Sequence, residues 1–393
     1  MTAAATDTLQ SGAKRTESRF PVNVDLNDND MDVRVGRKIF RIGYAPGDVQ
    51  DYNTRFIKTL EEIRMRTGKE LTLSDADYGY FMKELRDIGS GAYAFLRKAG
   101  IGEYIQTLET RESDRGISLD FTFPAGMGFL WQMMYTGSRL DNPVQEEKFW
   151  GFHYPIGNLF WDSETSPRIK LKDGIFASAH EELKSSLEEL NSLENLLKQV
   201  RAQINRNVMI QRVDEAISCD MLCSDDLFRY FNREDFEYGV VHFACHCVNP
   251  AEGAAQAYLL MTAKQTNLEL TLEMFNTLAE EECRFQCSPL VFLNACESQT
   301  PLHFLQSLNF PSGLINFGAG GVIATACTMP DYFANAFAAE FYDRLLKKPL
   351  AGTTASIGET LMETSYHFLK TKKNPLGLAY GLYAISNQEF KLE

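Results

Sequence analysis

Two stretches decide the fold of this chain: Gly239-Val-Val-His-Phe-Ala-Cys-His246 and Pro289-Leu-Val-Phe-Leu-Asn-Ala-Cys296. Each is a short apolar run, partly β-branched and bounded by Gly, Pro or polar residues, which is typical of a strand buried on both faces of a parallel sheet. Ligands of open α/β sheets bind outside the carboxyl ends of such strands. The two runs therefore predict neighbouring strands that bring His246 and Cys296 to one edge of a sheet.

Strands and helices alternate after about residue 166, which predicts an α/β fold with a mostly parallel sheet covered on both faces. We expect strands over residues 169–176, 208–213, 239–246, 289–296, 321–328 and 378–386, and helices over residues 178–205, 225–231, 268–279, 331–347 and 353–369. The long helix 178–205 has leucines on one face. We expect this face to pack on the sheet, with a coiled-coil partner as the alternative.

A first region of α+β character is expected over residues 21–165, followed by a second region over residues 166–393. Small and polar residues predict that residues 1–20 are disordered. In the first region we expect strands over residues 22–26, 33–35, 38–42 and 117–123, and helices over residues 51–66 and 73–98. All three tryptophans lie in this region and are expected in its core rather than in a ligand cage.

The chain has 393 residues and a net charge of −14, which argues against nucleic acid as the main partner because such binding needs a basic face. The first twenty residues lack the apolar centre of a signal peptide, and no membrane span is expected. Eight cysteines without such a signal suggest reduced thiols in a cytoplasmic protein. No P-loop or G-x-S-x-G elbow occurs, and no cofactor is expected.

An imidazole beside a thiol is the minimal machinery of a cysteine nucleophile, since the thiolate attacks and the imidazolium stabilises it. Cys296 precedes a polar segment in which a thiol would be accessible; a buried structural cysteine is the alternative. His246 is the favoured base because a loop is expected directly after it, whereas His242 lies in mid-strand and is expected in the core. Backbone N–H groups of Cys296 and Cys247 are the candidate oxyanion donors.

Asp331 follows the expected strand 321–328 and has two interpretations. Its carboxylate could form the floor of a pocket for a substrate Arg or Lys side chain. It could instead open the following helix, where an acidic residue suits the helix dipole. The residues alone do not decide between the two.

A structural zinc site is a further alternative, because Cys245-His246-Cys247 and two cysteine pairs could supply ligands. The pairs are Cys219/Cys223 and Cys283/Cys287. Both have a C-x3-C spacing, which is a weak indication of zinc. The glycine cluster Gly318-Ala-Gly-Gly321 precedes its strand, so we expect it to end a helix rather than to bind a dinucleotide.

With these residues in place, the chain resembles the CHAT-type peptidases, caspase-like relatives of separase. Both quoted strands resemble signature strands of that family, and further segments extend the likeness over roughly residues 145–393. These segments are Phe149-Trp-Gly-Phe-His-Tyr-Pro-Ile, Ala179-His-Glu-Glu, and Gly321-Val-Ile-Ala-Thr through Asp331 to Phe341-Tyr342. The resemblance implies a caspase-like, mostly parallel sheet sandwiched by helices, with a degenerate, pseudo-caspase-like N-terminal region.

The resemblance implies endopeptidase cleavage of proteins, with Cys296 as nucleophile and His246 as base or acid. It places Asp331 at the position that separase-like members use to recognise a basic residue at P1. Two positions depart from the family. Cys247 stands where glycine is usual, which bears on the oxyanion geometry, and Cys327 stands where tryptophan is frequent, which bears on the pocket shape.

Many members of this family are effectors in bacterial defence, including antiviral defence, that stay inactive until a sensor engages them. This sequence contains no recognisable sensor module, so we expect a separate activator protein or cleavage by another peptidase. The aromatic N-terminal region is the expected docking surface for such a partner. The alternatives are a catalytically silent scaffold that binds a partner, and a zinc-stabilised regulatory module.

Overall fold

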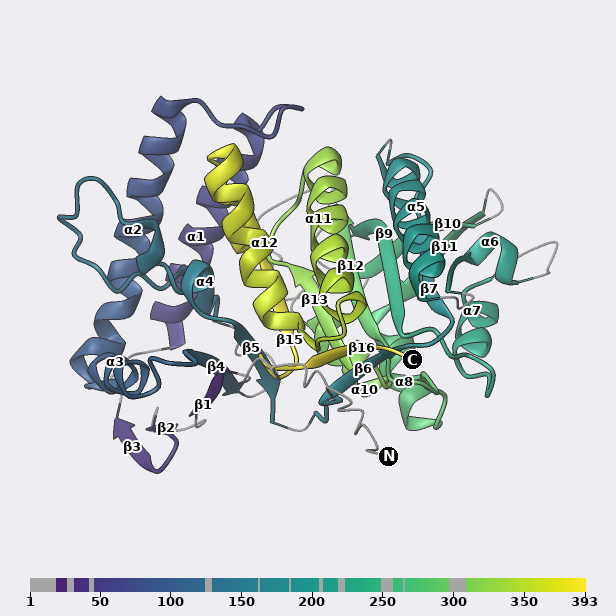
Figure 1. Ribbon diagram of the computed structural model, residues 1–393, viewed down its shortest axis with the longest axis horizontal. Coiled ribbons are helices and arrows are strands. Elements are labelled where there is room, and N and C mark those ends of the chain that lie inside the picture. The colour runs from purple at the N-terminus through teal and green to yellow at the C-terminus, as the bar shows by residue number, and fades with distance from the viewer. Residues whose placement is uncertain are drawn as a thin grey trace, which may run out of the picture.

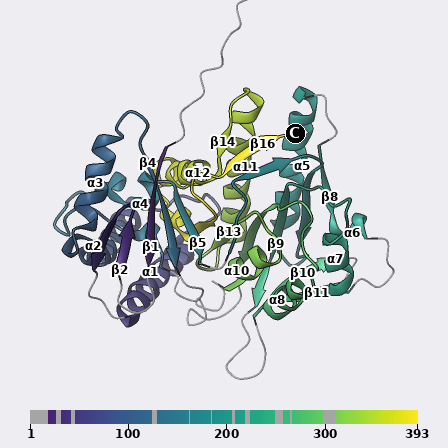
Figure 2. The same cartoon turned by 90° about the horizontal axis from the view of Figure 1, so that it is seen from below.

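The computed structural model describes residues 19–26, 32–41, 46–123, 129–161, 163–183, 185–204, 208–217, 223–248, 257–263, 266–296 and 309–393. Within these residues, thirteen strands form one sheet, and helices cover both of its faces (Figure 1 and Figure 2). The α/β architecture with a mostly parallel central sheet, as expected from the sequence, is confirmed.

The centre of the sheet is parallel. Its five strands lie in the order β8 (Met209–Arg212), β7 (Gly174–Ala179), β9 (Val240–Val248), β12 (Leu290–Cys296) and β13 (Gly321–Thr325). Strands β7 and β9 are largely buried on both faces, whereas β8 at the side is partly exposed. The first six residues of β9 are all buried, as the continuous apolar run predicts. Because these strands run in one direction, their carboxyl ends meet at one edge of the sheet.

The N-terminal region continues the same sheet. Beyond β13 the order is β15 (Tyr380–Tyr383), β5 (Ile156–Phe160), β4 (Ile117–Phe123), β1 (Phe20–Leu26), β2 (Asp32–Val35) and β3 (Lys38–Arg41). Of these neighbouring pairs, β13–β15, β1–β2 and β2–β3 are antiparallel. The pairing of Leu382 with Gly157 joins the two regions, and the expected domain boundary near residue 165 stays a prediction.

A hairpin that the sequence analysis missed forms the opposite end of the sheet. It consists of β10 (Tyr258–Ala263) and β11 (Thr266–Thr271), and β10 pairs antiparallel with the last residues of β9. A separate three-stranded sheet contains β14 (Ala355–Ser356), β16 (Glu389–Leu392) and β6 (Arg168–Leu171). The hairpin matters for the site because β10 pairs with His246 and with the two residues after it.

Helices on one face of the sheet pack side by side: α5 (Ser186–Ile204), α11 (Asp331–Leu350) and α12 (Ile357–Lys372) (Figure 1). Figure 2 shows α7 (Ser224–Phe231), α8 (Leu272–Glu280) and α10 (Asn309–Asn316) on the other face. The remaining helices are α1 (Pro46–Arg66), α2 (Asp75–Lys98), α3 (Ile101–Arg111), α4 (Trp150–His153) and α6 (Val213–Ala216), with 3-10 turns over Trp131–Met133, Glu146–Lys148 and Pro375–Ala379. Among the helices of the described segments, none has the length and apolar character needed to cross a bilayer.

The expected strand 169–176 is in fact two strands, β6 and β7, in different sheets. The break falls at Gly174, whose φ of +127° suits glycine alone, and a Cβ there would lie 1.9 Å from the Met209 carbonyl oxygen. The polar triplet Lys172-Asp173-Gly174 divides the expected strand and is a turn signal that the sequence analysis missed. A glycine that allows two backbones to approach closely is the physical reason for the error.

The expected helix 178–205 begins only at Ser186, because β7 extends to Ala179. A turn comes next, in which the Leu183 N–H and the Ser186 hydroxyl both donate to the His180 carbonyl oxygen. The leucine face of α5 packs inward as expected, with Leu190, Leu193 and Leu197 buried. This packing favours the sheet over a coiled-coil partner.

Two further boundaries were wrong. The first four residues of the expected helix 268–279 belong to β11, and α8 starts after Thr271, whose hydroxyl accepts from the Met274 N–H and caps the helix. Strand β9 continues through Val248 instead of ending at His246, because β10 pairs with it. The first part of the expected loop 248–255 is therefore strand, and its remainder lies outside the described residues.

Three smaller expectations can be compared with the structure. Trp131 and Trp150 are buried, but Trp161 is 40% exposed and lies outside the core. The glycine cluster ends α10 as expected, since Gly318 adopts φ +101° and the Ala319 N–H donates to the Leu314 carbonyl oxygen. Residues 1–18 of the expected disordered segment lie outside the described residues, and β1 already begins within its last residues.

Candidate active site

The backbone register brings the two sequence-predicted reactive positions together. Strands β9 and β12 pair in parallel from Val240↔Leu290 onward, and the last pair is His246↔Cys296. Adjacent strands lie about 4.8 Å apart, so residues 246 and 296 are direct neighbours although fifty positions separate them in sequence. The backbone of Cys296 is described, whereas its side chain and the next residues, 297–308, lie outside the description.

At His246 the neighbour of β9 on one side is no longer β7 but β10. On one side it is paired with Cys296 of β12, and on the other with Leu260 of β10. Its side chain is half-buried. The next residue, Cys247, is 7% exposed and stands opposite Leu259 in the ladder, so the candidate oxyanion donor belongs to a strand rather than to a loop.

A second histidine, His180, packs against His246. It comes directly after β7, and its N–H donates to the Ala244 carbonyl oxygen of β9 over 2.9 Å. The two imidazole rings lie 4.6 Å apart between centroids, edge to face. His180 is only 2% exposed, and its Nδ1 accepts from the Glu182 N–H over 3.3 Å. Burial, and then the nearby His246, lower the pKa of His180 and favour its neutral form.

These two histidines and Glu182 form what we call the edge cluster. Each of the three residues offers one potential metal-ligating atom, and these atoms lie within 4.8 Å of one another. Glu182 is exposed and His246 is half-buried. The sequence analysis noted Ala179-His-Glu-Glu only as part of a resemblance. Contact between residues 180 and 246 depends on the pairing of β7 with β9, which no local pattern reveals.

A buried set of polar groups, the core polar cluster, lies farther inside the same strands. Glu189 of α5 accepts a 2.6 Å hydrogen bond from the Asn294 side-chain amide of β12. Its Oε1 also lies 2.9 Å from Nε2 of His242, without the angle of a good hydrogen bond. His242 Nδ1 contacts the Tyr342 hydroxyl at 3.1 Å, and the Tyr380 hydroxyl donates to Asn294 over 2.9 Å.

The core polar cluster connects α5, α11 and β15 to the two strands that carry residues 246 and 296. His242 is fully buried, as the sequence analysis expected of a core histidine. The Glu189 side chain is 4% exposed, and burial together with this carboxylate raises the pKa of Tyr342. Because buried polar groups need partners, these contacts fix the helices and strands relative to one another.

Asp331 is the first residue of α11, after Pro330 at the N-cap. This place agrees with the helix-opening interpretation, and it leaves the pocket interpretation as a proposal. Strand β13, which precedes Asp331, lies parallel and adjacent to β12. Asp331 and Cys296 are thus associated with the carboxyl ends of neighbouring strands.

Among the described cysteines, the zinc alternative can be examined only for Cys283 and Cys287, whose thiols have separate partners. Cys219 lies outside the described residues, and Cys223 is exposed. The thiols of Cys283 and Cys287 donate to two different carbonyl oxygens, those of Phe228 and Tyr238. Burial raises the pKa of Cys287 to about 12, which disfavours the thiolate that zinc binds.

A cavity of about 340 Å³ lies beside the edge cluster. It is lined by the end of β7, the start of α5, Thr262 of β10 and the charged residues Glu181, Arg212 and Asp214. This volume falls within the range of about 300–1,000 Å³ that ligand pockets occupy. The cavity and the paired residues 246 and 296 lie at the same edge of the sheet.

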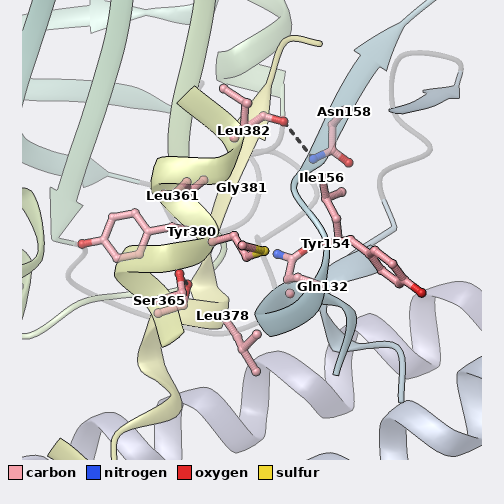
Figure 3. A pocket seen from close by; sticks show the side chains of 14 residues that line it. Gln132, Tyr154, Ile156, Asn158, Leu361, Ser365, Leu378, Tyr380, Gly381 and Leu382 are labelled. Atoms are coloured by element: carbon pink, nitrogen blue, oxygen red, sulfur yellow. Dashed lines mark hydrogen bonds between the residues drawn. The ribbon is translucent and has the colours of Figure 1, made fainter. Parts of the chain in front are cut away.

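A much smaller cavity of about 30 Å³ lies where β15 and α12 meet the N-terminal region (Figure 3). Gln132, Tyr154 and Tyr380 are among its lining residues. The Asn158 side chain bridges the junction beside it and donates to the Leu382 carbonyl oxygen over 2.9 Å. Such a volume holds about one water molecule, so this cavity is a packing gap rather than a substrate site.

Comparisons with known proteins give one family and several partial likenesses. A family model described as the CHAT domain matches residues 162–375. A probable protease of Vitiosangium sp. is 37% identical over 100 residues, which cover 25% of this chain and 12% of that protein. This chain therefore spans only a small part of the length of the curated relative that it matches.

Two solved structures show a partial likeness of fold. Separase in the Saccharomyces cerevisiae separase–securin complex is 7% identical, with a TM-score of 0.48, over 95% of this chain and 30% of that one. The Arg-specific cysteine proteinase gingipain R is 9% identical, with a TM-score of 0.47, over 96% of this chain and 79% of that one.

Proposed function

The chain belongs to the CHAT domain family, and from this premise we propose that it is a cysteine endopeptidase with His246 and Cys296 as its catalytic dyad. The pairing His246↔Cys296 at the end of the β9–β12 ladder is the observation that carries the proposal. Register-matched residues of adjacent strands share a face of the pleated sheet. The proposal places the Cys296 thiol and the His246 imidazole together on that face.

The proposed reaction divides peptide hydrolysis into two steps. The Cys296 thiolate attacks the scissile carbonyl carbon, and the C–N bond breaks as the His246 imidazolium gives its proton to the leaving amine. A water molecule then attacks the thioester while His246 accepts its proton, which releases the acid product and the free thiol. Backbone N–H groups of Cys296 and Cys247 are the proposed donors to the oxyanion in both steps.

Asp331 is proposed to select substrates with Arg or Lys at P1. Its position after β13, the strand next to β12, supports this role because both strand ends face the same edge. A carboxylate that pairs with a guanidinium or ammonium group provides a charge-assisted contact. The same carboxylate can serve the N-terminus of α11, since one group can interact with both.

We further propose that the protein acts as an effector in bacterial defence that a partner or a cleavage event activates. The family resemblance is the support for this role. The N-terminal region is the proposed docking surface. Full-rate digestion of protein substrates by the isolated, uncleaved chain would contradict the activation step while leaving the peptidase proposal intact.

The test is mapping of new protein termini in cells that express either the full chain or its Cys296→Ala variant under activating conditions. We expect termini that follow Arg or Lys and that occur only with the intact thiol. Cys223→Ala is the matched control, because Cys223 is exposed and distant in sequence from the proposed site. Identical sets of termini with Cys296 and with alanine would contradict the proposal and favour the silent scaffold.

A further inference from the structure

We propose that His180, Glu182 and His246 form an inhibitory binding site for Zn²⁺. The metal would occupy the imidazole that the proposed reaction needs for proton transfer. Only this effect on catalysis rests on the proposed function. The binding site itself rests on the geometry of the edge cluster.

The ligand set is the first observation. Two imidazoles and one carboxylate are typical ligands of Zn²⁺, which is often held by three protein groups and one water or exchangeable ligand. The three potential ligand atoms already lie within 4.8 Å of one another. Zinc–ligand bonds of about 2.0–2.2 Å require a somewhat closer approach. The exposed Glu182 side chain is able to move and supply it.

The second observation is the state of His180. Its ring is almost fully buried, and its Nε2 atom has no hydrogen-bond partner among the described residues. Buried polar atoms are normally paired, so the unpaired Nε2 of His180, whose ring contacts His246, supports a ligand-binding role for this ring.

Backbone hydrogen bonds place the main chains of both histidines before a metal binds. The His180 N–H donates to Ala244, two residues before His246 on β9. The His180 carbonyl oxygen accepts from Leu183 and Ser186, which fixes the turn after β7. Two rigid ligands and one adaptable ligand form a site that requires little reorganisation on binding.

Proton movement on binding can be derived from the observed contact. Since Nδ1 of His180 accepts from the Glu182 N–H, the neutral ring carries its proton on Nε2. Ligation through Nε2 requires the other neutral tautomer, with the proton on Nδ1, so the long 3.3 Å contact from the Glu182 N–H is lost.

This site differs from the binding of zinc to a catalytic thiolate, because none of its ligands is a cysteine. The test therefore begins with the inactive Cys296→Ala variant of the full chain, freed of metal with a chelator. Titration with Zn²⁺ alone, monitored by calorimetry, is expected to give one ion per chain. Co²⁺ in its place is expected to show ligand-field bands without thiolate charge-transfer absorption.

Glu182→Gln and His180→Gln, each made in the Cys296→Ala background, are expected to weaken binding at least about tenfold. Glu181→Gln is the matched control, a neighbouring exposed carboxylate outside the ligand set, and is expected to bind as the parent does. Circular dichroism checks the fold of the His180 variant, and the exposed Glu182 gives the second, structurally mild variant. Unchanged affinity in both variants, or loss of zinc in Cys296→Ala, would overturn the site.

The activity arm uses the intact thiol. Zn²⁺ is expected to inhibit peptide cleavage, and Glu182→Gln is expected to retain basal activity while losing most of this inhibition. Binding without any peptidase activity would support the site and count against the proposed function. Cleavage that zinc inhibits equally in both proteins would support the function and contradict the site.

Discussion

The two histidines of β9 lie four residues apart on one strand and have different surroundings. His242, in the core polar cluster, is fully buried and contacts a carboxylate and a tyrosine from two helices. His246, in the edge cluster, is half-buried. It lies beside His180, whose Nε2 has no hydrogen-bond partner among the described residues. The difference teaches that position along the strand separates a polar group that fixes the fold from one that is available for chemistry.

The largest expected effect on stability belongs to the core polar cluster. Glu189→Ala leaves the Asn294 amide and His242 without their carboxylate partner inside the protein. Loss of one partner from such a buried set costs about 3–5 kcal/mol, which urea unfolding of the full chain measures. Glu182→Ala in the edge cluster is the matched control and is expected to stay within about 0.5 kcal/mol. Equal losses in the two variants would remove the distinction between the clusters.

The second prediction concerns activity without stability. Asp331→Asn is expected to lower kcat/KM for peptides with Arg or Lys at P1 by about 10- to 100-fold, because a charge-assisted contact is lost. Cleavage of peptides with a neutral P1 residue is expected to change little, and the unfolding midpoint should stay close to that of the parent. A uniform loss over all peptides would assign Asp331 to the start of α11 alone.

A smaller effect is expected from Tyr380→Phe, which removes one hydroxyl from the core polar cluster. The Asn294 side chain then loses the hydrogen bond that it accepts over 2.9 Å. We expect a loss of about 1 kcal/mol in unfolding free energy, measured with urea. Tyr80→Phe is the surface control, since Tyr80 is 54% exposed and should show no measurable change.

The smallest prediction is a dependence of stability on pH. Burial and His246 lower the pKa of His180 in the folded state, whereas the unfolded ring keeps its ordinary value near 6.5. The unfolded chain therefore binds the proton first, and stability falls as pH drops below that value, by at most about 1.4 kcal/mol per pH unit for one group. His180→Gln should show a shallower fall between pH 6.5 and 5. An identical fall in both proteins would contradict the assignment.

The sequence predicted those parts of the fold that depend on continuous local patterns. The apolar runs before His246 and Cys296 identified β9 and β12, and strict alternation identified β4 without error in its ends. The hairpin of β10 and β11 escaped because most of its second strand was taken as the start of a helix. The break at Gly174 escaped because the turn signal Lys172-Asp173-Gly174 was read as part of one strand.

Of the site, the sequence predicted only the two residues near the ends of β9 and β12. Residues 246 and 296 were expected to be neighbours, and the register confirms this pairing. The places of His180 and Glu189 depend on which strands and helices become neighbours in space. Helical spacing places Glu189, unlike Glu188, on the side of Leu193. No local pattern shows that Glu189 meets Asn294 of β12 and His242 of β9.

The central claim, that His246 activates the Cys296 thiol, is tested most directly by the rate of iodoacetamide alkylation at Cys296 as a function of pH. Mass spectrometry measures each cysteine separately, and the buried Cys245 and the half-buried Cys287, whose pKa values are raised, provide slow internal references. The account predicts alkylation of Cys296 that persists well below pH 8 and reverts to the behaviour of an ordinary thiol in His246→Gln. Identical pH profiles in the two proteins would contradict it.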